Sequence, residues 1–354
     1  MPMSNHSIAD LLGSSDQLVS KGSPYKLTAF LESVIPLETH SALYNSVLPA
    51  IVECISDIAK TLRHSQHVSL VGTANAFGDD QLNVDVSAEN LVRACLTKCP
   101  SVVMASSEED PVEKASGSTG ASPNGAATQE QYTIAFDPLD GSSIIAPNWT
   151  VGTIIGIWTG TSALHQVPAE KQIASVLGVY GPRTTAIVAL RIPGTEPSCF
   201  EVGIGEHGLQ DSDIIRPKVQ LASPPFKTRY FAPANLRAAA EDPKYMDLIT
   251  HFVQNRYTLR YSGGLVPDIV HALVKGHGVY LSPVTGKSKA KLRRVYELFP
   301  IALIIECAGG NAIDPVDGSD ILARPAEDTD ERAGLVCGTT EDVEFVRKVL
   351  VAEE

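Results

Sequence analysis

The sequence predicts an α/β protein whose helices and sheets lie in layers, and three observations support this fold class. Residues 44–63 carry apolar side chains at three-and-four spacing, the pattern of an amphipathic helix with one buried face. From about residue 132, runs rich in β-formers are separated by turns, which indicates a large mixed sheet. Helix and strand patterns then alternate through the second half of the chain, which favours helices packed on sheets.

The predicted elements extend along most of the chain. In order they are a helix at 44–63, a helix that begins at Ser87, strands at 132–136, 150–158, 173–180 and 184–190, helices at 241–254 and 266–275, a strand at 278–282 and a helix at 341–351. Ser87 is the expected N-cap of the second helix. Residues 111–130 are rich in Gly, Ser, Ala and Pro and should form a surface loop. Prolines and small residues at 215–228 suggest a boundary between two domains, residues 1–221 and 222–354.

Length and composition indicate an ordinary globular protein. At 354 residues and 37.7 kDa, with 44% hydrophobic residues, the chain should bury a sizeable core in about two domains. Its strongest continuous apolar runs, such as 301–305, last about five residues, whereas a membrane-spanning helix needs roughly 18. The first residues lack the basic-then-apolar order of a secretory signal. We therefore expect a cytoplasmic protein that does not enter a membrane.

The net charge limits the classes of partner, and the cysteine content indicates the redox state of the thiols. The net charge of -13 argues against nucleic acid or an anionic membrane as a general partner. Residues 287–294, KSKAKLRR, are a basic exception, which is either a solvated face or a binding site for an anion. The six cysteines are scattered, as expected for reduced thiols. Cys95 and Cys99 lie four apart on a predicted helix, where they either pack against a neighbour or serve a redox or metal role.

Two apparent nucleotide motifs fail on context. GIGEHG at 203–208 matches the dinucleotide-binding pattern, but the residues after it do not begin a helix and no βαβ unit surrounds it. TGKS at 285–288 resembles a phosphate-binding loop, but that motif requires a glycine where this chain has Leu281. We therefore expect neither a dinucleotide fold nor a P-loop.

The segment FDPLDGSS, which begins at Phe136, places two carboxylates three residues apart at the end of a strand. We expect the strand to end at Phe136, because Pro138 cannot extend the ladder and favours a turn. Asp137 and Asp140 would converge in that turn, where they repel each other unless a cation lies between them. Mg²⁺ prefers oxygen ligands, and the carbonyl of Leu139 could add a third. The alternative is a turn that the aspartates stabilise without any ligand.

Residues near this segment extend the possible chemistry. Gly141 lets the backbone approach a ligand, and the N–H groups around Ser142 can hold a phosphate oxygen. Glu108 and Glu109 end another predicted strand, so both carboxylate sets could meet at one sheet edge. Glu297 lies just beyond the basic cluster. Carboxylates beside Lys and Arg are typical of metal-assisted phosphoryl chemistry, in which metals polarise the ester and a spare carboxylate takes a proton.

Taken together, these motifs resemble the fructose-1,6-bisphosphatase and sedoheptulose-1,7-bisphosphatase family. The resemblance depends on FDPLDGSS followed by VGTIIGIW, with SSEED before it and KLRRVYE after it, and it extends from about residue 44 to the C-terminus. DPLDG alone would also fit the wider superfamily that contains inositol monophosphatases. The resemblance implies a layered α-β-α-β-α sandwich of the sugar phosphatase type with mixed sheets. It also implies a Mg²⁺-dependent enzyme that takes a sugar bisphosphate and forms a homodimer or homotetramer.

The resemblance implies a role for each matching position. The implied ligands of two or three Mg²⁺ ions, with Mn²⁺ as an alternative, are Glu108, Asp137, the Leu139 carbonyl, Asp140, Glu297 and Asp79. The implied proton acceptors, which take a proton from the attacking water, are Glu109 and Asp85. The substrate-binding candidates are Gly141, Ser142, Asn235, Arg260, Tyr261, Lys291 and Arg293, of which Arg260 would reach into the neighbouring subunit's site.

Within the family the match favours the sedoheptulose branch. GVYGPRTT at 178–185 and YTLRYSGGLVPD at 257–268 resemble that branch, and Ser282 stands where fructose enzymes commonly have a sugar-contacting tyrosine. The predicted reaction is hydrolysis of the 1-phosphate of sedoheptulose 1,7-bisphosphate to sedoheptulose 7-phosphate and phosphate. The alternatives are a fructose-1,6-bisphosphatase with the same chemistry and a non-catalytic sugar-phosphate sensor.

Two regulatory features of relatives do not match. The AMP-regulated fructose enzymes have a Lys-Tyr pair where this chain has Gln131-Tyr132, and ETHSAL lacks their nucleotide-binding pattern. Chloroplast members are switched by a cysteine pair in a loop, whereas residues 111–130 contain no cysteine. We therefore expect neither AMP inhibition nor thioredoxin control of that form.

Overall fold

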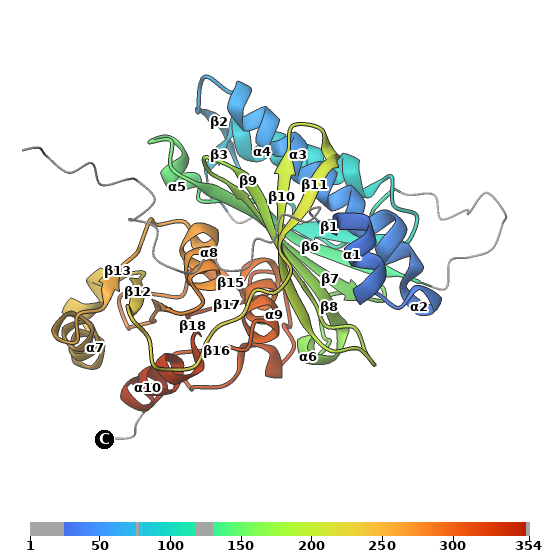
Figure 1. The fold of residues 1–354 in the computed structure, drawn as a ribbon. Coiled ribbons are helices and arrows are strands. Elements are labelled where there is room, and N and C mark those ends of the chain that lie inside the picture. Colours follow the sequence, from blue (N-terminus) through green and yellow to red (C-terminus); the bar gives the residue numbers. More distant parts are fainter. Residues whose placement is uncertain (1–24, 76–77, 79, 118–129, 352–354) are drawn as a thin grey trace, which may run out of the picture.

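The computed structural model describes residues 25–75, 78, 80–117 and 130–351, which form five alternating layers of helices and sheets (Figure 1). The outer face of a large sheet is covered by α1 (Leu27–Val34), α2 (Leu37–Ala42), α3 (Leu48–His64) and α4 (Asn83–Leu96). The layer between that sheet and a smaller one contains α8 (Leu265–Lys275) and α9 (Phe299–Cys307). The last layer contains α7 (Pro243–Gln254) and α10 (Thr340–Leu350). This arrangement confirms the predicted α-β-α-β-α fold class with mixed sheets.

The large sheet has nine strands within the described residues, in the order β1-β11-β10-β9-β8-β7-β6-β4-β5. Their bounds are β1 (Tyr25–Lys26), β4 (Val102–Ser107), β5 (Lys114–Ala115), β6 (Tyr132–Asp140), β7 (Val151–Thr159), β8 (Gln172–Tyr180), β9 (Thr184–Leu190), β10 (Ser198–Gly205) and β11 (Gly208–Arg216). Adjacent strands are antiparallel except β4 and β6, where Ser107 lies opposite Phe136. Because parallel strands end at the same edge, the residues that follow β4 lie beside the end of β6.

The second sheet has the order β13-β12-β14-β18-β16. Its strands are β12 (Tyr230–Pro233), β13 (Thr258–Leu259), β14 (Val279–Ser282), β16 (Asn311–Ile313) and β18 (Leu335–Gly338). Two short ladders lie apart from the sheets: β2 (Leu70–Ala74) with β3 (Asp80–Leu82), and β15 (Leu292–Arg293) with β17 (Arg332–Ala333). The short helical segments are η2 (Leu43–Val47), α5 (Ser142–Ile145), α6 (Pro168–Lys171), η3 (Leu236–Ala240), η4 (Arg294–Leu298) and η5 (Ile321–Ala323).

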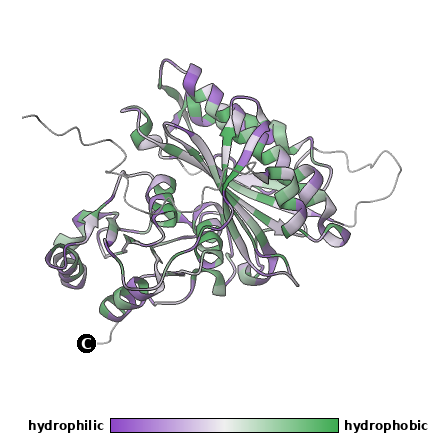
Figure 2. Ribbon diagram, in the orientation of Figure 1, coloured by the Kyte–Doolittle hydropathy of each residue, from purple (hydrophilic) through white to green (hydrophobic). Residues whose placement is uncertain are grey.

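Three hydrophobic cores hold the five layers together. One lies between the outer helices and the large sheet, one surrounds α8 and α9 between the two sheets, and one lies between the small sheet and α7 and α10. In the middle core, Trp158 of β7 meets Phe299 of α9 edge to face at 5.8 Å between ring centroids. In the last core, Phe231 stacks on Phe252 at 5.0 Å. Figure 2 shows green segments on the elements that enclose these cores, with purple segments among the outer helices. The apolar spacing that predicted the helices therefore corresponds to buried faces.

Two predicted boundaries are wrong, and both lie near the acidic motif. The strand continues through Pro138 to Asp140 instead of ending at Phe136, and its pairing with β7 shifts register between Asp137 and Asp140. Such an irregularity tolerates proline because the ladder is already interrupted there. Helix α4 begins at Asn83, so Ser87 is an interior residue, and its hydroxyl donates to the Asn83 carbonyl at 2.8 Å.

The first long helical stretch differs from the prediction in how it begins. The predicted helix at 44–63 corresponds to the π-helical turn η2 followed by α3. The continuous stretch Leu37–His64 is long and apolar enough, by length and composition, to cross a membrane, but 56% of its most apolar window is buried inside the protein. Cys95 of α4 packs against this stretch, since its thiol donates to the Ala50 carbonyl at 3.0 Å.

The connection between the sheets and the rejected dinucleotide motif have simple structures. GIGEHG joins β10 to β11 as a hairpin, with Gly205 opposite Gly208, so no helix follows it. Residues 217–229 connect the large sheet to the small one. Backbone hydrogen bonds hold this connection at two points: the Val219 N–H donates to the Cys199 carbonyl at 2.7 Å, and the Leu221 N–H donates to the Ala308 carbonyl at 2.8 Å. The predicted domain boundary after residue 221 lies in this connection and stays a prediction.

A glycine in β7 allows helix α8 to approach the large sheet. A Cβ at Gly152 would lie 2.5 Å from Cβ and Cγ1 of Val266, closer than atoms can pack. We expect Gly152→Ala to lower the free energy of unfolding by about 1–3 kcal/mol, because α8 must move away from β7. Urea unfolding measures the change, and Gly286→Ala is the matched control because nothing lies within 4 Å of its added Cβ. Equal stability of the two variants would contradict the tight α8–β7 contact.

Candidate active site

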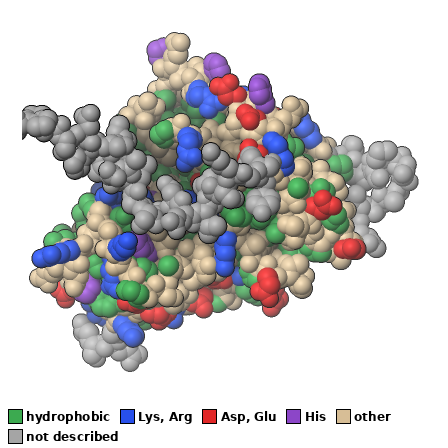
Figure 3. Space-filling model, in the orientation of Figure 1, with side chains coloured by type: hydrophobic (Ala, Val, Ile, Leu, Met, Phe, Trp, Pro, Cys, Tyr) green, Lys and Arg blue, Asp and Glu red, His purple; other side chains and the backbone are tan. Residues whose placement is uncertain are grey.

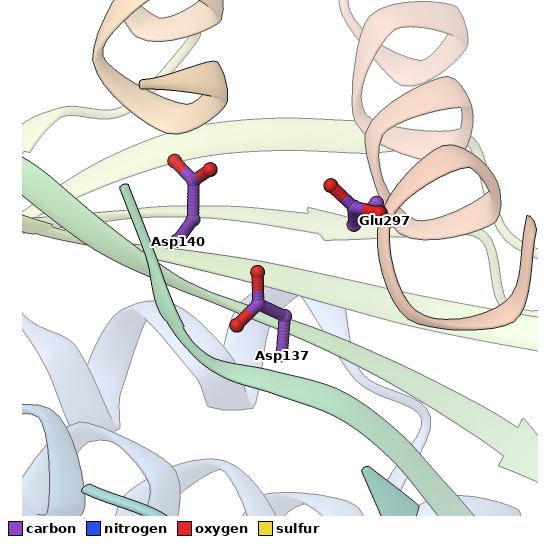
Figure 4. Close-up of side chains that lie close together, drawn as sticks. All are labelled: Asp137, Asp140 and Glu297. Atoms are coloured by element: carbon purple, nitrogen blue, oxygen red, sulfur yellow. The ribbon is translucent and has the colours of Figure 1, made fainter. Parts of the chain in front are cut away.

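Three buried carboxylates from distant parts of the chain converge at the end of β6 (Figure 4). Asp137 and Asp140 come from β6, and Glu297 comes from η4, the π-helical turn that leads into α9. Ligand oxygens of the three side chains lie within 4.8 Å of one another, although the side chains are only 5–8% exposed. The structure therefore brings together three of the predicted metal ligands.

Asp140 also attaches α8 to the large sheet. Its carboxylate accepts the N–H of Val266 at 2.7 Å and the N–H of Leu265 at 3.2 Å, both in the first turn of α8. A helix N-terminus has unpaired N–H groups and a positive end, so a carboxylate is stabilised there. Asp137 accepts the N–H of Leu139 at 3.0 Å, which is the aspartate-stabilised turn of the alternative interpretation. That turn and a metal-binding role are compatible, because each carboxylate oxygen has a second lone pair.

Glu108 and Glu109 follow β4 and lie beside the cluster, as the parallel pairing requires. The N–H of Glu108 donates to the Phe136 carbonyl at 3.1 Å, which holds the segment against β6. The Glu108 carboxylate forms an ion pair with Arg293, whose side chain is 3% exposed. Glu109 accepts a hydrogen bond from Gln81 in β3. The two neighbouring glutamates thus contact different elements, β15 and β3.

Asp85 lies in the first turn of α4 and faces the same site. Its carboxylate accepts the Leu82 N–H at 3.0 Å, which caps the helix, and the hydroxyl of Ser142 at 3.4 Å. Burial raises the pKa of Asp85 to about 6, and the charge of Glu109 adds to this effect. A carboxylate with this pKa is ionised at neutral pH but accepts a proton more readily than an exposed aspartate.

A cavity of about 420 Å³ collects these groups, and we call it the acidic cavity. Its lining consists of Asn75, Asp85, Glu108, Glu109, Asp137, Leu139, Asp140, Gly141, Ser142, Lys291, Arg293, Glu297 and Arg332. Six carboxylates therefore face three basic side chains. Of those three, Arg293 is paired with Glu108, and Arg332 with Asp330 at 2.8 Å. The interior of the acidic cavity consequently has an excess of negative charge.

The environment of the buried cluster disfavours ionisation. Burial raises the pKa of Asp137 well above its ordinary value, and Glu108, Asp140 and Glu297 raise it further. Burial also raises the pKa of Glu297, again with help from Glu108. The pKa of Asp140 is raised to about 6 by burial, although the α8 amides oppose the shift. Carboxylates in this position become stable anions when a cation is present.

The donor set fits a hard divalent cation. Carboxylate oxygens of Asp137, Asp140 and Glu297 converge from three directions, and Glu108 and the backbone of Leu139 line the same space. Mg²⁺ and Mn²⁺ take such oxygen ligands, whereas none of the described residues brings a thiol or imidazole to the lining of this cavity to favour a softer metal.

The other predicted residues divide between two further cavities. Asn235 and Lys291 line a cavity of about 520 Å³ that we call the basic cavity. Arg260 and Tyr261 line a third cavity of about 700 Å³, where the Arg260 guanidinium lies over the Tyr230 ring at 5.7 Å. Lys291 lines both the acidic and the basic cavity, so the two adjoin there. Asp79 lies outside the described residues.

The basic segment 287–294 is not a uniform solvated face. Lys287, Lys289 and Lys291 are exposed, whereas both arginines are buried. Arg294 pairs with Asp314 at 2.8 Å inside the protein and so has a structural role. The solvated-face interpretation therefore applies only to the lysines.

The sequence reasoning missed two residues that line the acidic cavity, Asn75 and Arg332. Asn75 precedes the acidic stretch before α4, and a polar residue in that loop was the only available signal. Arg332 gave no signal, because it reaches the site through the pairing of β17 with β15, where it lies opposite Arg293.

The fold and the carboxylate-lined cavity define a metal-dependent phosphatase of the layered α/β type, and comparison with known proteins identifies the family. Residues 32–212 match the fructose-1-6-bisphosphatase N-terminal domain, and residues 225–351 match the C-terminal domain of the same enzyme. The chain belongs to the fructose-1,6-bisphosphatase family. Members of this family are sugar bisphosphatases, which are phosphoric monoester hydrolases; they depend on metal ions and form oligomers.

Relatives of both branches are similar to this chain. The chloroplastic sedoheptulose-1,7-bisphosphatase of Triticum aestivum is 36% identical over 82% of this chain and 70% of its own length. The class 1 fructose-1,6-bisphosphatase of Syntrophotalea carbinolica is 34% identical over 86% of this chain and 88% of its own length. A crystal structure from Toxoplasma gondii, provisionally named a sedoheptulose-1,7 bisphosphatase, has a TM-score of 0.78 at 32% identity, covering 92% of this chain and 98% of its own.

The raised pKa values predict that metal binding and pH act together on stability. The pKa of these carboxyl groups is higher in the folded protein than in the unfolded chain, where it is about 4. Their contribution to stability is complete below the unfolded pKa and is lost as pH rises through the pKa of the folded protein. The metal-free protein should therefore lose stability from these groups as pH rises from about 5 to about 7.5, through the pKa of about 6 at Asp140. Excess Mg²⁺ should raise the melting temperature more at the higher pH.

Thermal melts with EDTA or Mg²⁺ at both pH values measure this linkage. Asp137→Asn removes one of the titrating groups and should reduce both the pH dependence and the Mg²⁺ effect. A Mg²⁺ effect of equal size at both pH values, in both proteins, would contradict a site built from these carboxylates.

Proposed function

We propose that this protein hydrolyses the 1-phosphate of sedoheptulose 1,7-bisphosphate with the help of Mg²⁺. The observation that carries the proposal is the junction of the acidic and basic cavities at Lys291. A substrate with a phosphate at each end needs a metal-binding site for the reacting phosphate and a cationic site for the other. The two adjoining cavities supply this pair of environments.

The described side chains divide the chemical tasks among them. When bound, Mg²⁺ would supply positive charge that polarises the phosphate ester and makes water easier to deprotonate. Asp137, Asp140, Glu297 and Glu108 would hold it, with the Leu139 carbonyl as a further oxygen. Asp85, whose pKa is raised to about 6, would accept a proton from the attacking water with Glu109 beside it. The Ser142 hydroxyl and the backbone at Gly141 lie where the reacting phosphate would be oriented.

The conformation of Gly141 supports the idea that this turn approaches a ligand. Its φ of 102° is in the left-handed region, and a Cβ there would lie 3.0 Å from Val151 Cγ1. A residue with a side chain is therefore strained at this position. The turn places Ser142 at the start of α5, beside Asp85.

The sedoheptulose branch is supported by where its motifs lie. Gly181 and Pro182, from the hairpin between β8 and β9, line the third cavity together with Arg260 and Tyr261. Two segments that resemble the sedoheptulose enzymes, far apart in the chain, thus meet at one surface. Ser282 ends β14 next to Pro283, whose carbonyl accepts the side-chain amide of Asn235 at 3.4 Å. A serine at this position, one residue from the partner of Asn235, would leave more room for a longer sugar than a tyrosine.

Fructose 1,6-bisphosphate is the second candidate substrate. It is supported by the similarity of this chain to class 1 fructose-1,6-bisphosphatases. The 34% identity to a fructose enzyme and the 36% identity to a sedoheptulose enzyme are too close to separate the branches. The chemistry at the acidic cavity would be the same, and only the fit of the sugar and distal phosphate would differ.

The assembly and setting of the enzyme complete the proposal. We propose a homodimer or homotetramer in which Arg260 reaches the neighbouring subunit's site, since its side chain lines the third cavity and neither of the other two. A cytoplasmic location, where the reaction would supply pentose phosphates, stays a prediction. On the face drawn in Figure 3, basic and acidic side chains are interspersed among polar and apolar ones.

The first test compares phosphate release from the two bisphosphates by the purified protein with Mg²⁺. We expect kcat/KM to be about tenfold higher for sedoheptulose 1,7-bisphosphate, the size of effect that one extra carbon produces in a fitted site. A higher value for the fructose substrate would reverse the branch assignment. Binding of either sugar without phosphate release would support the non-catalytic sensor instead.

Asp85→Asn tests the proton acceptor with minimal change of shape. An asparagine oxygen can still accept the Leu82 N–H, so α4 should stay capped and the melting temperature should be close to that of the wild type. We expect kcat to fall about 100-fold or more, the contribution typical of a general base. Asp57→Asn, the same substitution at a half-exposed position in α3, is the control. Retention of full activity by Asp85→Asn would assign the proton to another group.

A further inference from the structure

The basic cavity has a second cationic element besides the lysine segment 287–294. Arg237 lies in η3, two residues after Asn235, and lines the cavity together with Lys287, Lys289 and Lys291. These four basic side chains come from two segments about 50 residues apart, so the fold creates the positive surface. The cavity contains one carboxylate, Glu241, and therefore has a net positive charge.

Glu241 contacts the lysine segment and leaves the cavity cationic. Its carboxylate accepts a hydrogen bond from the Thr285 hydroxyl, which keeps the pKa of Glu241 below its ordinary value. Thr285 in turn shapes a tight turn, because its N–H donates to the Ser288 carbonyl at 2.8 Å and its hydroxyl accepts the Ser288 N–H at 2.9 Å. Glu241 thus fixes the turn that presents Lys287, and it forms no ion pair with Arg237.

The Arg237 side chain is exposed and lines the basic cavity. It is close enough to Tyr261 to lower the pKa of the Tyr261 hydroxyl, against burial and Asp268, which raise it. Within the described part of the chain, no carboxylate forms a salt bridge with Arg237. An exposed arginine that shares a cavity with three lysines, and has no acidic partner among the described residues, is a suitable receptor for a phosphate.

We propose that Arg237 is a substrate-binding residue that contacts the phosphate at the far end of the sugar, opposite the one that is released. This inference rests on the proposed bisphosphatase function and adds a specificity-determining residue to it. The planar guanidinium can donate two parallel hydrogen bonds to a phosphate, whereas Lys287 and Lys291 supply point charges from the other segment that lines the cavity. Arg237 and the lysines would then bind the distal phosphate together, so that the cavity distinguishes a bisphosphate from a monophosphate.

Arg237→Gln tests the proposal by a split between binding and turnover. The loss of a charged, bidentate contact should raise KM for sedoheptulose 1,7-bisphosphate about tenfold or more, with kcat within about twofold of the wild type. Arg237→Lys keeps the charge but loses the fork and should give an intermediate KM. Arg256→Gln is the matched control, because Arg256 is also an exposed arginine but lies at the opposite end of α7 and lines none of the cavities described above.

A substrate without the distal phosphate supplies the decisive comparison. On sedoheptulose 1-phosphate, Arg237→Gln and the wild type should give the same kcat/KM, because the group that Arg237 contacts is missing. An equal loss on both substrates would show that Arg237 acts on folding or on the acidic cavity, and would overturn the proposal. An unchanged KM for the bisphosphate would overturn it as well.

Equilibrium binding separates this proposal from the proposed reaction. Sedoheptulose 7-phosphate has only the distal phosphate, and its dissociation constant can be measured by calorimetry without turnover. We expect it to bind Arg237→Gln about tenfold more weakly than the wild type or Arg256→Gln. If the wild type releases no phosphate but this difference is found, the proposed reaction fails and the assignment of Arg237 stands. Equal binding by all three proteins would reject Arg237 even where the enzyme is active.

Discussion

The structure depends on the burial of like charges at the junction of its two sheets. Asp137 and Asp140 lie at the end of a strand of the large sheet, and Glu297 lies in the π-helical turn that leads into α9 between the sheets, so their repulsion acts where the halves of the chain meet. Burial raises the pKa of all three, and repulsion from neighbouring carboxylates adds to the shift, from Glu108 at Asp137 and Glu297 and from Asp268 at Asp140. The α8 amides offset part of this cost at Asp140. A divalent cation would offset the rest, which couples metal binding to the cohesion of the protein.

Side chains close to the carboxylate cluster are divided between structural and chemical roles. Arg293 and Arg294 are adjacent in the chain, yet both are buried in ion pairs, the first with Glu108 and the second with Asp314. The lysines before them stay exposed and line the basic cavity. The arginine end of this basic segment therefore stabilises the acidic region, whereas its lysine end gives the basic cavity exposed positive charge. The opposite polarities of the adjoining cavities follow from this division.

The layered architecture explains how the site can be both rigid and open. β4 and β6 run parallel, which brings Glu108 beside the end of β6, while Gly152 lets α8 approach closely enough for its amides to reach Asp140. The register shift in β6 lies between Asp137 and Asp140, whose carboxylates converge. Each feature belongs to a regular element, so the ligand geometry is held by strands and helices, and the substrate-facing residues lie on the turns and short helices around them.

The sequence determined the fold class and most of the chemistry, because apolar spacing reports buried faces and FDPLDGSS places carboxylates at fixed positions along one strand. The spacing of residues in the sequence could not show that β6 continues through Pro138, because proline usually ends a ladder. Only the pairing with β7 reveals the register shift at this point. Nor could it decide that Asp85, rather than Ser87, caps α4. Tertiary structure alone decided that Glu297 approaches the aspartates, that Arg293 is buried and that Arg332 lines the acidic cavity. These contacts join residues separated by large stretches of chain, and their energies depend on distances that no local pattern encodes.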